Sequence, residues 1–122
     1  MALLTNTRGY IERVAEQAVK SYDVGLYDAS CVMVRKLLEI LIIELFEKNK
    51  IDSKIKNTAG DFFYLSDLIS VLNNETAWNI GRNAKKGLAE IKKLGDMSAH
   101  NRRFTAKKSD LDKVKEDLRI VI

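Results

Sequence analysis

The sequence predicts an all-α protein, an up-and-down bundle of four long helices plus one short helix. Three observations favour this fold. The 122 residues contain no proline, the residue that interrupts helices most strongly. Runs typical of strands are scarce, whereas apolar residues recur three and four positions apart in several stretches. One long stretch, residues 28–48, is apolar around most of a helix, which is typical of a helix enclosed by others.

The segment 28–48 is expected to be the central helix, about 30 Å long at 1.5 Å per residue. Four charged residues interrupt its apolar part and argue against a membrane span, which needs roughly 20 mostly apolar residues; they are Arg35, Lys36, Glu39 and Glu44. The helix is therefore enclosed by the other helices of a bundle, or one of its faces is covered by a second copy of the chain.

A first helix is predicted over residues 7–22, and Gly25 suits its C-terminal end. Because few residues separate it from the central helix, the two should pack antiparallel as a hairpin. After the central helix, the polar, turn-rich segment 49–60 is predicted to be a loop with room for a short helical piece.

Two helices are predicted in the middle of the chain from their periodic apolar residues. One covers 62–72, with Asp61 as its N-cap. The next covers 75–94 and is expected to break at Gly95, after which a basic loop follows.

Ser109 is expected to open the last helix, because Ser109 and Asp112 are spaced as in a capping box. The apolar pattern of this helix stops abruptly at Ile122, which leaves open that the natural protein continues beyond it. Residues 1–122 are predicted to form a single domain.

The cysteine content and the N-terminal residues predict a cytoplasmic protein. The chain has one cysteine, Cys31, so no disulfide can form within it and a reducing compartment is indicated. We interpret Cys31 as a small buried hydrophobe. The N-terminus lacks the charged start and apolar run of a signal peptide, and no membrane contact is expected.

The basic excess lies entirely in the C-terminal third. Residues 82–122 carry 12 Lys or Arg against 6 Asp or Glu, a net +6, whereas residues 1–81 carry 9 against 11, a net −2. Such asymmetry indicates an anionic partner, nucleic acid first, although a solvated basic surface without a partner explains it about equally well.

The single histidine, His100, is the first candidate for chemistry. No cysteine or carboxylate stands near it at metal-ligand spacing, so neither a metal site nor a cofactor is predicted. Asp96, four residues earlier, is expected to be its hydrogen-bond partner and to orient the imidazole. On the central helix, Arg35 and Glu39 are expected to pair with each other or to reach across to the His100 segment.

Polar and basic residues around His100 suit a phosphate backbone. Phe104 among them could stack on a base, although we favour its burial against the bundle. The predicted nucleic-acid contacts are Lys93, Asn101, Arg102, Arg103, Lys107 and Lys108.

Two segments together resemble the HEPN superfamily: Tyr-Asp-Ala-Ser-Cys-Val-Met-Val-Arg-Lys-Leu-Leu-Glu at 27–39 and Ile-Lys-Lys-Leu-Gly-Asp-Met-Ser-Ala-His at 91–100. The chain is most similar to a bacterial branch of uncharacterised domains that are often attached to restriction or defence proteins. In that branch an alanine-rich helix carries an Arg-x-x-x-Glu pattern, and a Gly-Asn-x-Ala-x-His type segment joins the last helices.

The resemblance implies a helical bundle that dimerises and a defence or toxin–antitoxin setting, with an antitoxin or another defence protein as a further partner. Active HEPN members are metal-independent ribonucleases that use an Arg-x(4–6)-His motif from each protomer. Counting back from His100, the arginine position falls on Gly95, Leu94 or Lys93, so only Lys93 offers a cation. Lysine is a point charge rather than a planar fork, which weighs against strong nuclease activity.

The sequence thus predicts a dimerising, HEPN-like domain that binds RNA or a nucleotide. One alternative is a weak metal-independent ribonuclease that uses His100, Lys93 and Arg102. Another is a purely structural dimerisation module whose basic surface is incidental.

Overall fold

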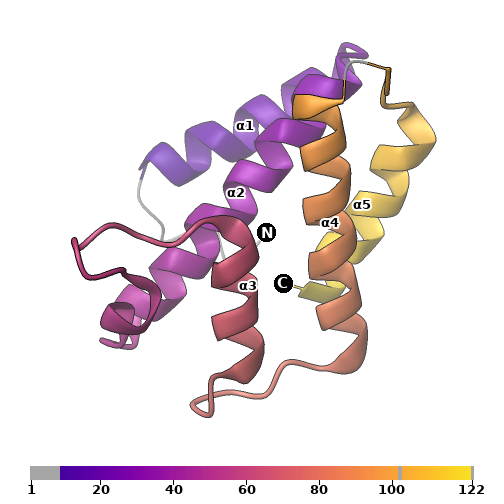
Figure 1. Ribbon diagram of the computed structural model, residues 1–122. Coiled ribbons are helices and arrows are strands. Elements are labelled where there is room, and N and C mark those ends of the chain that lie inside the picture. The colour runs from indigo at the N-terminus through magenta and orange to yellow at the C-terminus, as the bar shows by residue number, and fades with distance from the viewer. Residues whose placement is uncertain (1–8, 102, 122) are drawn as a thin grey trace.

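The computed structural model describes residues 9–101 and 103–121, with the side chains of Tyr10 and of 117–121 left aside. Within this part of the chain all regular elements are helical, which confirms the predicted all-α class (Figure 1). The elements are α1 (Gly9–Asp23), α2 (Tyr27–Lys48), a 3-10 helix η2 (Asp52–Ile55), α3 (Leu65–Asn74), α4 (Arg82–His100) and α5 (Lys108–Val121).

Helix α2 is central, as its apolar pattern predicted, and it packs against every other helix. Its buried residues extend from end to end: Ser30, Cys31, Val34, Leu37, Leu38, Ile42 and Phe46. At the C-terminal end, the ring of Phe46 meets Trp78 edge-on at a centroid distance of 5.1 Å. Cys31 is 2% exposed and packs against Ala106 and Leu111, as expected of a small hydrophobe.

Helices α1 and α2 form the predicted hairpin and run in opposite directions (Figure 1). Gly25 has φ +83°, the left-handed conformation that glycine adopts without strain. The amide of Leu26 donates to the carbonyl of Ser21 at 2.8 Å. One turn into α2, the Ser30 hydroxyl donates to the carbonyl of Ala18 at 2.7 Å and ties the two helices together.

Helix α3 begins at Leu65, so the prediction that it starts at residue 62 with Asp61 as N-cap is wrong. The chain is extended before the helix, because Phe62 forms an isolated antiparallel bridge with Lys56. The amide of Phe63 donates to the carbonyl of Ile55 at 2.9 Å, which holds this extended segment in place.

Helix α4 spans Arg82–His100, so the predicted start at residue 75 and the predicted end before Gly95 are both wrong. The segment before α4 is held outside the helix by the buried Glu75, which accepts hydrogen bonds from Lys54 at 2.8 Å and from the amide of Ala77 at 3.1 Å.

Gly95 does not break α4 but lets it approach α2 closely. A Cβ built on Gly95 would lie 2.6 Å from the Cβ of Arg35, nearer than side chains can approach. The glycine therefore marks the point where the two helices touch.

Helix α5 begins at Lys108, and the predicted Ser109–Asp112 capping box is wrong. Instead, the carboxylate of Asp110 accepts a hydrogen bond from the amide of Lys107 at 2.9 Å. Asp112 accepts a hydrogen bond of 2.7 Å from the hydroxyl of Tyr22, which joins α5 to α1 and raises the pKa of Tyr22 to about 12.

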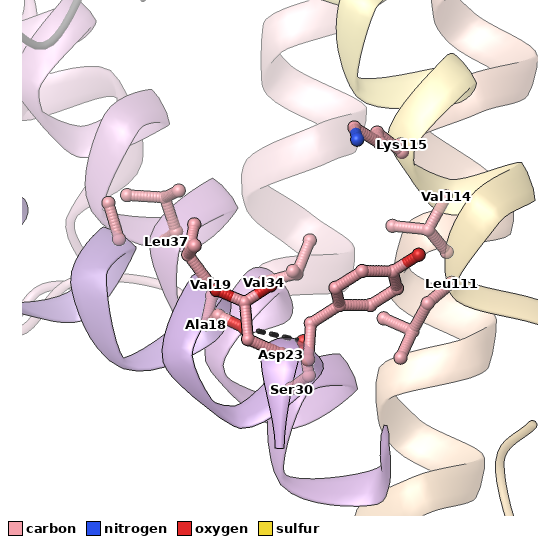
Figure 2. Close-up of a pocket in the computed structure, with 11 residues that line it drawn as sticks. Ala18, Val19, Asp23, Ser30, Val34, Leu37, Leu111, Val114 and Lys115 are labelled. Atoms are coloured by element: carbon pink, nitrogen blue, oxygen red, sulfur yellow. Dashed lines mark hydrogen bonds between the residues drawn. The ribbon is translucent and has the colours of Figure 1, made fainter. Parts of the chain in front are cut away.

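An apolar pocket of about 210 Å³, open to solvent, lies between α1, α2 and α5 (Figure 2). Val19 from α1, Val34 from α2, and Leu111 and Val114 from α5 line it. Lys115 lies at the α5 side of this pocket. No helix in the described residues has both the length and the apolar character that a membrane crossing requires.

We predict that Gly95→Ala destabilises the fold although alanine is the better helix former. The added methyl group would clash with the Cβ of Arg35, which cannot move without its backbone. The free energy of unfolding in urea should fall by about 1–3 kcal/mol. Gly9→Ala is the matched control, because among the described residues its Cβ would meet only the flexible end of Arg13 at 3.3 Å. Equal stability of the two variants would contradict the close contact.

Candidate nucleic-acid interface

One face of α4 carries several of the predicted site residues. Asp96, Met97 and His100 follow Lys93 by three, four and seven positions, and since α4 is one continuous helix the four residues share a face. Lys93 and His100 are exposed, whereas Asp96 and Met97 are partly buried between them.

Two adjoining open hollows lie along this face and share Asp96 and Met97. We call them together the α4 groove. The first, of about 400 Å³, lies between α3 and α4 and is lined by Ser66, Ile69, Ala89, Lys92, Lys93, Asp96 and Met97. The second, of about 560 Å³, lies at the C-terminal end of α4 and is lined by Asp96, Met97, His100, Asn101 and Arg103.

Asp96, in the middle of the α4 groove, is held by two cations. One carboxylate oxygen accepts a hydrogen bond from Nε of Arg35 at 2.6 Å, and the other accepts from the Lys92 ammonium one turn earlier in α4. Arg35 also lies 3.7 Å from the carboxylate of Glu39. Arg35 therefore does both things that the sequence allowed: it pairs with Glu39 and reaches across to the segment that ends at His100.

The two cations keep Asp96 ionised. Burial by itself would raise the pKa of the Asp96 carboxyl, but the hydrogen bonds and charges of Lys92 and Arg35 outweigh burial and lower this pKa below its ordinary value of 3.8. A carboxylate with both oxygens paired in this way adds little net negative charge to the groove.

His100 is the last residue of α4, and its imidazole is exposed. Both oxygens of Asp96 are directed to Arg35 and Lys92 rather than to His100. The predicted Asp96–His100 hydrogen bond is therefore not formed in the part of the chain that the structure describes. Since no other hydrogen bond reaches the imidazole there, nothing in this region fixes its orientation.

Asn101 ends α4 and orders the turn that follows. Its amide donates to the carbonyl of Met97 at 3.0 Å, and its side-chain oxygen accepts from the amide of Arg103, also at 3.0 Å. Arg103 lines the second hollow together with His100. Among the predicted contacts, Lys93, Asn101 and Arg103 all line the α4 groove.

The remaining predicted residues lie elsewhere. Arg102 lies outside the described residues. Lys107 and Lys108 are exposed at the start of α5 and do not line either hollow. Phe104 is half-buried against the cluster of Cys31, Ala106 and Leu111, which agrees with its interpretation as a packing residue.

Sequence reasoning missed Ser66 and Met97 as parts of the groove. Met97 was not recognised because Gly95 was interpreted as the end of the helix. With the helix ending there, nothing in the sequence placed Lys93, Met97 and His100 on one helical face. Ser66 comes from α3, and no pattern within the chain indicates which residues of α3 face α4.

The groove can bind an anion more readily than it can hold a metal ion. Its exposed cations are Lys93 and Arg103, with His100 between them in the groove. Among the described residues, no three His, Cys, Asp or Glu side chains converge as metal ligands. Lys93 and His100 are two turns apart, about 10 Å along the helix axis, so they suit separate parts of an extended anion.

Comparisons with models of known protein families, with curated proteins and with solved structures find no match to this chain. The HEPN resemblance consequently rests on the two sequence segments alone.

We predict that Asp96→Asn lowers stability in a pH-dependent way. The folded pKa of Asp96 lies below 3.8, so its ion pairs stabilise the fold fully above that pH and lose this effect as the pH falls through the folded pKa. At pH 7 the substitution should lower the free energy of unfolding by about 1–3 kcal/mol, and the difference should vanish in strong acid.

Urea unfolding across this pH range measures the effect. Glu16→Gln is the control, since Glu16 pairs with Lys20 at i,i+4 but both side chains are more than half exposed, where such pairs contribute little. If Asp96→Asn lowers the free energy of unfolding by the same amount at all pH values, the carboxylate charge of Asp96 does not have the stabilising role described above.

Proposed function

We propose that this protein binds single-stranded RNA through the α4 groove. The observation that carries the proposal is that Lys93, His100, Asn101 and Arg103 line two adjoining open hollows along α4. The groove follows α4 for more than two turns, which suits a strand with several phosphates better than a single phosphate group.

The state of Asp96 supports this proposal. An unpaired carboxylate in the middle of the groove would repel a phosphate. Because Arg35 and Lys92 each bind one of its oxygens, and Glu39 lies beside Arg35, the charge of Asp96 is balanced within this cluster. The net charge of +6 over residues 82–122 adds a longer-range attraction for a polyanion.

We further propose that the chain is a HEPN-like domain that dimerises and works in a defence or toxin–antitoxin setting, beside an antitoxin or another defence protein. The resemblance of residues 27–39 and 91–100 supports the family and the setting. For the dimer, α2 offers apolar side chains that the other helices do not fully cover: Leu45 is 38% exposed, and Ile40 and Leu41 are partly exposed.

We predict that RNA binding weakens steeply with salt and that Lys93 and Arg103 account for part of this dependence. For single strands the log–log slope changes by about 0.7 per phosphate contact, so replacing both residues by alanine should flatten it by about 1.4. Fluorescence anisotropy of a labelled oligonucleotide over a salt series measures the slope.

The matched control for that experiment is Lys36→Ala with Lys48→Ala. Both lysines are exposed on α2, and their removal changes the net charge by the same amount. If the slope flattens equally in the control, the salt dependence reflects the net charge of the protein and not contacts in the groove. No binding by the wild-type protein at low salt would dispose of the RNA proposal.

The second candidate is a metal-independent ribonuclease, favoured by the position of Lys93 and His100 on one face of α4. Such an enzyme needs a group that takes up and releases a proton beside a cation that meets the charge on the phosphorane. His100 could supply the first and Lys93 the second, but in the described residues no partner orients the imidazole. This argues for binding rather than efficient cleavage.

We predict that the wild-type protein cleaves labelled single-stranded RNA slowly or not at all in EDTA, and that His100→Ala lowers RNA affinity. Product ends and binding constants are measured on the same preparation. Rapid cleavage to 2′,3′-cyclic phosphate ends that His100→Ala abolishes would make the ribonuclease the better assignment. Lys93→Ala in the same assay would then show whether the lysine acts as the cation.

A further inference from the structure

Tyr64 has a position that neither helix capping nor packing explains. Its side chain is 85% exposed, more than any other large hydrophobic side chain in the described residues. It occupies the N-cap of α3, where Ser, Thr, Asp or Asn would accept a hydrogen bond from the first turn, and it makes no such bond. The aromatic ring therefore contributes little to the fold.

The segment before α3 places a second aromatic residue on the same side. Residues 62–64 are extended, so alternate side chains point in opposite directions. Phe63 packs against the core, while Phe62 and Tyr64 are directed outward, about 6.6 Å apart along the chain. The Lys56 ammonium lies 5.0 Å from the centre of the Phe62 ring, which leaves Tyr64 as the more open of the two rings.

Tyr64 is also close in the chain to the α4 groove. Ser66, two residues further on, lines the first hollow together with Lys92 and Lys93. In Figure 1 the N-terminal end of α3 lies beside the middle of α4, the helix that carries these two lysines. The exposed Tyr64 thus precedes by two residues the α3 side of this basic groove.

We infer that Tyr64 is a stacking platform for an unpaired base of the RNA whose phosphates lie in the α4 groove. This inference rests on the proposed function and narrows its ligand to single strands with accessible bases. Bases stack on aromatic rings whatever their identity, because every base has a π-face. The contact therefore adds affinity and discrimination against duplexes without a strong sequence preference.

The test compares wild-type protein and Tyr64→Leu in binding to three probes of equal length: single-stranded oligouridine, an abasic ribose-phosphate strand and an RNA duplex. Leucine keeps an apolar side chain but removes the ring. Tyr64→Leu should weaken binding to oligouridine by roughly 5- to 100-fold and leave binding to the abasic strand unchanged. The salt dependence should stay the same, since stacking releases no counterions.

Tyr64→Phe is the matched control, because it retains the ring and should bind like the wild-type protein. Urea unfolding should be the same for all three proteins, as expected for a side chain that is 85% exposed. Stability and binding can therefore be separated in this experiment.

The two proposals fail in different ways. If the wild-type protein binds oligouridine and the abasic strand equally, or if Tyr64→Leu binds oligouridine like wild type, base stacking is wrong and the groove proposal stands. If the wild-type protein binds none of the probes at low salt, both are overturned. If Tyr64→Leu instead lowers self-association with RNA binding unchanged, Tyr64 belongs to a protein interface and the inference is overturned.

Discussion

The close contact between α2 and α4 is the constraint on which the rest of the structure depends. Gly95 lets the two helices meet over the side chain of Arg35, and the neighbouring Asp96 then receives the guanidinium. Helix α5 packs on α4, and the groove lies on another face of α4. The position of this one helix therefore determines both the last part of the core and the surface offered to a ligand.

The sequence predicted the helices whose boundaries depend on local signals and failed where tertiary contacts decide them. The end of α1 and both ends of α2 lie within one residue of their predicted bounds, because a glycine turn and a strong apolar pattern mark them. The predicted start of the first helix at residue 7 lies outside the described residues. Helices α3 and α4 begin late, since a backbone bridge at Phe62 and the buried Glu75 hold the preceding residues extended. Neither contact leaves a periodic pattern in the sequence.

The residues of the candidate site could be named individually, but not their grouping. Lys93, His100 and Arg103 stood out by charge and chemistry, and the structure places them along one groove. Asp96 was assigned to the wrong partner, because i,i+4 spacing to His100 and i,i+4 spacing to Lys92 are equally compatible with one helix. Only the position of Arg35 on α2 determines which way the carboxylate is directed.

The apolar pocket between α1, α2 and α5 has a consequence for how strongly the C-terminal helix is held. The pocket, of about 210 Å³, opens to solvent, so part of the apolar surface of the helices around it stays in contact with water. Hydrophobic stabilisation follows the apolar area that is removed from water, and this seam therefore contributes less of it than a filled contact would. The Tyr22–Asp112 hydrogen bond, which joins α1 to α5, adds a polar contact where that burial is incomplete.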